Sequence, residues 1–117
     1  MSRAALMLAV SLLAYNLCAV AVEIKGVRTC GKWTEEKRLE NSTREMNRVP
    51  VLITKSWFLG YLSGRADYSD KDFLRGTDSD SIFLWLDNYC RDHPQMNLDK
   101  AGIDLARELM QMKGIKP

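Results

Sequence analysis

The chain has 117 residues, a length that allows one domain and no more. It carries 17 Lys and Arg residues against 15 Asp and Glu residues, which is a formal net charge of +2. This near balance argues against nucleic acid and against a polybasic membrane-binding surface, because both require a clustered basic excess.

The first 21 residues are typical of a secretory signal peptide. Arg3 supplies a positive start, residues 4–18 are an almost uninterrupted apolar run, and the last three residues fit the small-x-small rule for cleavage after Ala21. An uncleaved membrane anchor would need about 20 apolar residues, more than this run offers. A lipoprotein acylated at Cys18 is the other alternative, but the residues before it are too bulky. We therefore predict export to the periplasm, without membrane attachment after cleavage.

The cysteines divide between the leader and the mature chain. Cleavage would leave 96 residues with a net charge of +1, since Arg3 is the only charged residue of the leader, and with two cysteines, Cys30 and Cys90. We predict a disulfide between them because exported proteins meet oxidising conditions; two unpaired buried thiols are the alternative. The bond would close a loop of about 60 residues, worth roughly 4 kcal/mol in the chain-entropy model.

Residues 22–50 are polar and weakly periodic. We predict a short ordered piece around Cys30 and Trp33, then a mobile or weakly helical charged stretch that ends at Pro50. Residues 41–43 match a glycosylation sequon, which we interpret as chance because a leader alone does not establish a eukaryotic host.

The first clear helix is predicted over residues 51–63. Apolar side chains recur there at spacings of four, in two series formed by Ile53, Trp57 and Tyr61 and by Phe58 and Leu62. Gly60 and Gly64 share one face, and a helical glycine costs about 1 kcal/mol relative to alanine. The pair therefore predicts a groove for a close neighbour, in which packing offsets that cost.

Residues 65–77 are predicted to form a loop rich in Asp and Gly, with Phe73 turning into the core. Aromatic residues and arginines are enriched at interface hot spots. On this ground the candidate partner-binding residues are Arg65, Tyr68, Phe73 and Arg75. The alternative is an ordinary connecting loop.

Two further helices are predicted. Thr77 or Asp78 begins one, and Pro94 ends it near residue 92. Asn97 caps the other and Gly114 ends it. The apolar face of the last helix is formed by Leu98, Ala101, Leu105, Leu109 and Met112.

These elements predict an all-α domain of three to four helices closed by one disulfide. Residues 22–50 carry Cys30, and residues 51–117 form the helical core of the same domain. Trp33, Trp57 and Trp85 are expected to be its large core residues.

No combination of residues suggests catalysis. His93 is the only histidine, and we expect it to face solvent at a helix end. Zinc would need about four ligands. An EF-hand needs glycine at its sixth position, where counting from Asp70 gives Arg75 and counting from Asp78 gives Phe83. We expect a non-enzyme without metal or cofactor.

Four segments taken together resemble the HdeA-like superfamily of small exported proteins. Within it, the chain is most similar to the Rap/Tai-type immunity proteins of type VI secretion. The segments are residues 29–33, 57–64, 78–81 and 85–94, with the sequences TCGKW, WFLGYLSG, DSDS and WLDNYCRDHP. The resemblance covers roughly residues 29–112 and implies a periplasmic helical fold with a structural disulfide between Cys30 and Cys90.

The resemblance implies two functions and brings no catalytic residue. An immunity protein would bind and neutralise a cell-wall-degrading effector, whereas an acid-stress chaperone would loosen at low pH and hold unfolded clients. The number of acidic residues is ordinary, and the aromatic-rich residues 85–90 depart from the chaperone pattern. We therefore place immunity first, with an accessory periplasmic role as a third alternative. The expected partner is a protein, and a homodimer is compatible with each role.

Overall fold

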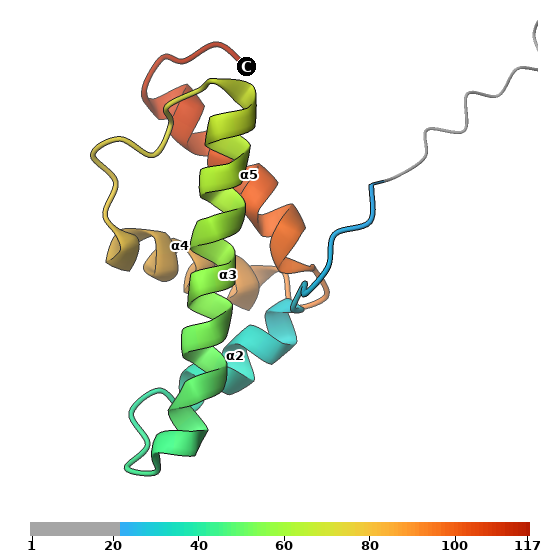
Figure 1. Ribbon diagram of the computed structural model, residues 1–117, viewed down its shortest axis with the longest axis vertical. Coiled ribbons are helices and arrows are strands. Elements are labelled where there is room, and N and C mark those ends of the chain that lie inside the picture. The colour runs from blue at the N-terminus through green and yellow to red at the C-terminus, as the bar shows by residue number, and fades with distance from the viewer. Residues whose placement is uncertain (1–21) are drawn as a thin grey trace, which may run out of the picture.

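The computed structural model describes residues 22–117, and the regular secondary structure of this part of the chain consists of helices, as Figure 1 shows. The helices are α2 (Cys30–Arg38), α3 (Glu45–Ser69), α4 (Ser79–Asp92) and α5 (Leu98–Met112). In the view of Figure 1, the long α3 lies in front and the other three helices cross behind it. The predicted all-α class is confirmed, while the predicted leader lies outside the described residues.

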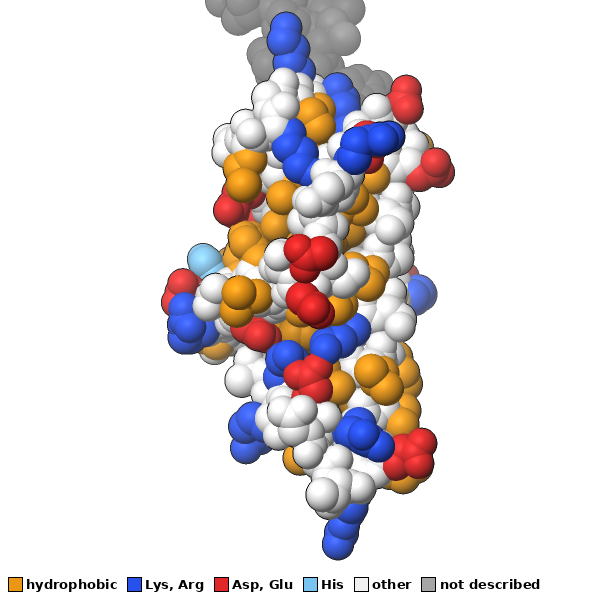
Figure 2. All heavy atoms as spheres, turned by 90° about the vertical axis from the view of Figure 1, so that its left-hand side faces the viewer, with side chains coloured by type: hydrophobic (Ala, Val, Ile, Leu, Met, Phe, Trp, Pro, Cys, Tyr) orange, Lys and Arg blue, Asp and Glu red, His pale blue; other side chains and the backbone are white. Residues whose placement is uncertain are grey.

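Within residues 22–117, no helix combines the length and the hydropathy that crossing a membrane would require. On the face shown in Figure 2, Lys and Arg side chains are interspersed with Asp and Glu side chains. That face therefore has no extended field of one sign.

The ordered piece predicted around Cys30 is the helix α2. The Thr29 side chain caps it, because its Oγ1 accepts a hydrogen bond from the Lys32 backbone N–H at 3.1 Å. The buried residues Cys30, Trp33 and Glu36 recur every third position and face the rest of the domain. Burial at this helical spacing explains why so polar a segment is an ordered helix.

The N-terminal end of α3 was predicted at Val51, but the helix begins at Glu45. Pro50 does not end the charged stretch before it; it lies inside the helix. At the sixth residue of the helix, Pro50 removes the N–H that would bond to the carbonyl of Met46, and its ring crowds that carbonyl, so burial of later residues of α3 such as Val51 and Thr54 must offset the cost.

The C-terminal end of α3 was also predicted too early. The helix passes through Gly64 and continues to Ser69, where Asp70 adopts a left-handed conformation with a φ of 54° and ends it. The predicted loop over residues 65–77 is therefore helical in its first five residues. The connection to α4 consists only of residues 70–78.

The last two helices agree closely with prediction. Asp78 caps α4, since its carboxylate accepts hydrogen bonds at 2.8 Å from both the backbone N–H and the hydroxyl of Ser81. Asn97 occupies the N-cap position of α5, and Gly114, with a φ of 66°, follows its end.

Side chains from all four helices and the 70–78 connection form one core. Its largest fully buried members are Trp33, Phe58, Phe73, Leu62, Leu86 and Leu98. Of the three tryptophans predicted there, Trp33 is buried, whereas Trp57 and Trp85 are half-buried at the edge. Met112 was predicted on the buried face of α5 and is 74% exposed, because the core ends one turn earlier at Leu109.

The predicted disulfide between Cys30 and Cys90 is confirmed. It joins the first residue of α2 to the C-terminal part of α4, and both cysteines are buried. The backbone supports the same junction, because the Cys30 N–H donates to the carbonyl of Met96 at 2.8 Å and the Leu98 N–H donates to the carbonyl of Arg28 at 2.9 Å. The start of α2 is therefore held against both α4 and α5.

Candidate protein-binding groove

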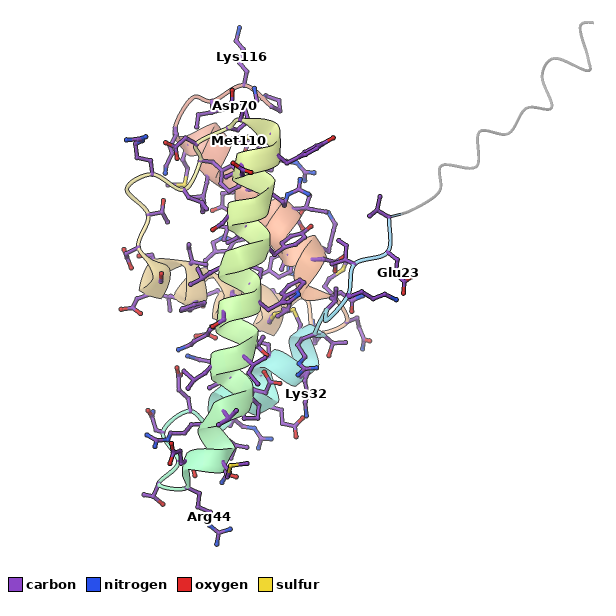
Figure 3. The ribbon with its side chains drawn as sticks, viewed as in Figure 1. Glu23, Lys32, Arg44, Asp70, Met110 and Lys116 are labelled. Atoms are coloured by element: carbon purple, nitrogen blue, oxygen red, sulfur yellow. A yellow bond between two sulfur atoms is a disulfide. The ribbon has the colours of Figure 1, made fainter. Side chains whose placement is uncertain are left out.

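An apolar groove of about 710 Å³ lies between the C-terminal half of α3 and the outer side of α5. Helix α3 forms one wall and α5 the other, while the 70–78 connection and the chain end close it at one end. The lining residues are Gly60, Tyr61, Gly64, Arg65, Tyr68, Ser69, Lys71, Phe73, Ile103, Ala106, Arg107, Met110 and Pro117. Figure 3 places Met110 of α5 beside the end of α3 marked by Asp70.

Glycines on α3 and α5 have opposite surroundings at this groove. A Cβ atom on Gly102 of α5 would lie 2.6 Å from Cε1 of Tyr61, so the aromatic ring lies directly against the α5 backbone. At Gly60 and Gly64 a Cβ would meet nothing within 4 Å. The groove predicted from the spacing of Gly60 and Gly64 is present, but no described residue of this chain fills the space next to them.

A ladder of stacked side chains on α3 positions the mouth of the groove. The rings of Trp57 and Tyr61 are nearly parallel, with centroids 5.2 Å apart. The guanidinium carbon of Arg65 lies 5.8 Å from the centroid of Tyr61, within the range of a cation–π contact. The indole N–H of Trp57 donates to the carbonyl of Lys25 at 3.1 Å, which fixes the start of the ladder.

The groove has an apolar floor and a basic mouth. Arg65, Lys71 and Arg107 contribute cationic side chains to its lining, and no lining residue is an Asp or Glu. Arg107 is paired with Asp104 at 3.2 Å. Tyr68 stands at the mouth and is 95% exposed.

Three of the four predicted partner-binding residues line this groove. Arg65 and Tyr68 do so from the last turns of α3 rather than from a loop, and Phe73 is buried in the groove floor. Arg75 lies outside it, where its Nε donates to Asp72 at 2.6 Å.

The α5 wall was missed from the sequence. Ile103, Ala106 and Met110 contribute its apolar surface. Their spacings of three and four residues mark a second apolar stripe beside the main buried face of α5, and this spacing was the available signal.

A second side-chain cluster joins α4 to α5. Tyr89 stacks on Trp85 at 4.9 Å and on His93 at 4.4 Å between centroids, and its hydroxyl donates to Asp104 at 2.8 Å. Burial and this hydrogen bond raise the pKa of Tyr89 to about 12. Partial burial acts to raise the pKa of Asp104, but hydrogen bonds from Lys100 and Tyr89 outweigh it and leave that pKa lowered.

Side chains of types that can bind a metal have other roles here. Cys90 is in the disulfide, exposed His93 is stacked on Tyr89, and Asp78 caps α4. Hydrogen bonds from Ser81 lower the pKa of Asp78. Within residues 22–117, no three His, Cys, Asp or Glu side chains lie close enough together to hold a metal ion.

An apolar floor with a cationic mouth suits a partner segment that presents apolar side chains flanked by carboxylates. Tyrosine and arginine at the mouth are residue types that dominate binding energy at protein interfaces. Comparisons of the chain with protein-family models, with curated proteins and with solved structures find no match.

Proposed function

We propose that this chain is an exported, non-enzymatic protein that binds a protein partner through the groove between α3 and α5. Within that class, we propose an immunity protein that neutralises a cell-wall-degrading effector. The leader supports export, and the resemblance of residues 29–112 to Rap/Tai-type proteins supports the immunity role.

The observation that carries the proposal is the unfilled apolar space beside Gly60 and Gly64. An open groove of about 710 Å³ next to a 95%-exposed tyrosine leaves apolar surface in water, which is unfavourable unless a partner covers it. The cations Arg65, Lys71 and Arg107 would orient a partner segment that carries carboxylates.

The test uses residues 22–117, purified with the disulfide intact, as bait for exported proteins at neutral pH and at about pH 3, where carboxylates protonate. An immunity protein should retain one cell-wall hydrolase at neutral pH and inhibit it at equal molar amounts. Retention of many proteins in acid alone would favour the chaperone, and retention of none at either pH would favour the accessory role.

Two matched variants connect the result to the groove. Gly64→Leu places a bulky side chain in the open space and should abolish inhibition. Gln111→Leu adds the same side chain to an exposed position of α5 outside the groove and should leave inhibition unchanged. Equal inhibition by both variants would contradict the assignment of the groove.

A further inference from the structure

The groove between α3 and α5 has two unlike ends. Its two walls run side by side in the same direction: at one end Tyr61 lies against Gly102, and at the other Figure 3 places Met110 beside the end of α3 marked by Asp70. At the Tyr61 end, the lining residues of both walls are uncharged. An apolar chain can therefore lie along this end without removing a charged side chain from water.

The cationic side chains of the lining are gathered toward the other end. On each wall an arginine comes one turn further along the helix, Arg65 on α3 and Arg107 on α5. Lys71 lies just beyond the end of α3, and no lining residue is an Asp or Glu. The groove is therefore polarised along its length, with an uncharged end and a cationic end.

Two of these cations have no acidic partner within the part of the chain that the structure describes. Among the ion pairs of residues 22–117, none involves Arg65 or Lys71. Arg107, by contrast, is paired with Asp104 at 3.2 Å. Arg65 and Lys71 thus keep charges that an anionic group in the groove would neutralise.

We propose that this groove binds a single-chain anionic amphiphile, the class that includes free fatty acids and monoalkyl phosphates. The alkyl chain lies along the uncharged end, over Gly60, Gly64 and Ile103, and the headgroup lies at Arg65 and Lys71. A Cβ atom at either glycine would meet nothing within 4 Å, so the space that the chain needs is open. Carboxylates and phosphates accept charge-assisted hydrogen bonds from both Arg and Lys.

The volume of the groove matches one alkyl chain and is too small for two. A methylene group occupies roughly the liquid volume of a water molecule, about 30 Å³. One chain of about 16 carbons then needs roughly 480 Å³, within the groove's volume of about 710 Å³, whereas two such chains need roughly 960 Å³. The groove also lies in the range of about 300–1,000 Å³ that is usual for small-molecule sites. The expected ligand therefore has one chain, unlike a membrane phospholipid.

The length of the groove sets the number of carbons that it can cover. From Gly60 to Ser69, helix α3 rises about 14 Å at about 1.5 Å per residue. An extended alkyl chain advances about 1.25 Å per carbon, because its C–C bonds are about 1.5 Å long. The groove therefore covers roughly 10–12 carbons, and methylenes beyond this number would project into water.

Amphiphile binding does not depend on the proposed protein partner, since it requires only the groove of this chain. The two ligands would need the same space beside Gly60 and Gly64, so one would exclude the other. An amphiphile at sufficient concentration would therefore control the access of the partner to the groove.

The first experiment titrates residues 22–117, which contain all four described helices, with sodium decanoate in a calorimeter at neutral pH and below micelle-forming concentrations. One decanoate should bind per chain. Decan-1-ol has the same chain length without the charge and should bind about tenfold more weakly or less. Decyl phosphate should also bind, and the tighter of the two anions identifies the headgroup. Absence of saturable binding, or equal affinity for decanoate and decan-1-ol, would overturn the proposal.

A chain-length series checks the fit to this groove. Affinity should rise about two- to fourfold for each methylene added between octanoate and dodecanoate, because each is at least half covered. From dodecanoate to tetradecanoate it should level off, since the added carbons lie outside the groove. A rise that continues at the same rate to tetradecanoate would contradict a chain confined to this site.

Matched leucine variants test the location of the alkyl chain. Gly64→Leu fills the space assigned to the chain and should weaken decanoate binding about tenfold or more. Gln111→Leu adds the same side chain to α5 outside the groove and should leave binding unchanged. Circular dichroism verifies that both variants remain helical, and equal affinities in the two variants would place the ligand elsewhere.

A charge variant tests the location of the headgroup. Arg65→Gln combined with Lys71→Gln removes both unpaired cations and should reduce decanoate affinity about tenfold or more. The affinity for decan-1-ol should stay the same, which a merely structural role of these two residues would not predict. Equal losses for the acid and the alcohol would overturn the headgroup assignment.

Discussion

A buried carboxylate, that of Glu36, connects α2 to α3. Glu36 is 3% exposed, and its Oε2 accepts a hydrogen bond from the Thr54 hydroxyl at 2.6 Å. Arg28 approaches the other oxygen, Oε1, to 3.5 Å, but that oxygen has no hydrogen bond within the described residues. A buried charge needs such partners, so the stability of the α2–α3 contact depends on them.

Thr54→Val tests this dependence. The substitution keeps the shape of the side chain and removes the hydroxyl, so the Glu36 carboxylate remains buried with one donor fewer. We expect the free energy of unfolding, measured by urea denaturation, to fall by about 1–3 kcal/mol. Ser56→Ala, on an exposed position of the same helix, should change it by less than about 0.5 kcal/mol.

Tyr89 provides a pH-dependent prediction at the same scale. Burial and the bond to Asp104 raise its pKa from 10.0 to about 12, so the folded state holds this proton more tightly than the unfolded chain does. Its contribution to stability is complete below pH 10 and is lost as the pH rises from about 10 to about 12.

Ultraviolet titration of residues 22–117 should therefore show one tyrosine that ionises at about pH 12. Tyr89→Phe should remove this component, and Tyr68→Phe, at an exposed position of α3, should leave it in place. Loss of the component in the Tyr68 variant alone would show that the raised pKa had been assigned to the wrong tyrosine.

At the scale of elements, the same residue type has opposite effects in the two facing helices. Gly102 of α5 is required, because Tyr61 occupies the place of its missing side chain. Gly64 of α3 is not required by this chain's own packing, because the space beside it is open. Glycine lowers the helix propensity of α3, so its presence at position 64 is consistent with a surface that stays open for another molecule.

Paired alanine substitutions separate these effects. Gly102→Ala should lower the free energy of unfolding by about 1–3 kcal/mol, because the added methyl would overlap the Tyr61 ring and displace it. Gly64→Ala should raise the same quantity by about 0.5–1 kcal/mol through helix propensity alone. Thermal and urea unfolding of both variants measure the difference, and destabilisation by Gly64→Ala would mean that the space beside it is not open.

For the whole molecule, the disulfide fixes the relative positions of the N-terminal and C-terminal segments. Cys30 and Cys90 are separated by 60 residues, and each is nearly inaccessible to solvent. The bond restricts the unfolded chain to conformations that keep these residues together, which stabilises the folded state. A domain of this size has little hydrophobic burial with which to replace that contribution.

The double substitution of Cys30 and Cys90 to Ser should therefore lower the free energy of unfolding by about 4 kcal/mol. Guanidinium unfolding of the oxidised chain, of the same chain with reductant and of the double variant measures this loss. The reduced chain and the variant should agree closely. A loss below about 1 kcal/mol would show that the core holds the N-terminal segment without the bond.

Several features of the fold follow from local sequence, and the structure bears them out. Two of them depend on the residue type at one position: the cap of α4 at Asp78 and the end of α5 at Gly114. A third, the disulfide between Cys30 and Cys90, depends on the pairing of two residues. Such features are predictable because their physical causes act over a few residues or, for the cysteines, because the predicted removal of Cys18 with the leader leaves one pairing to expect.

The sequence by itself thus determined the helical class, the disulfide between Cys30 and Cys90, and the pair of glycines at residues 60 and 64 that predicts a groove. Only the tertiary structure decided that α3 extends from Glu45 to Ser69 and that α5 supplies the second wall of the groove. Pro50 costs a backbone hydrogen bond and crowds the preceding turn, and the burial of Val51, Thr54, Phe58 and Leu62 against other parts of the domain outweighs this local penalty. The spacing of Ile103, Ala106 and Met110 marks an apolar stripe on α5, but which helix lies across from it depends on contacts between segments far apart in the chain, and such contacts leave no local mark.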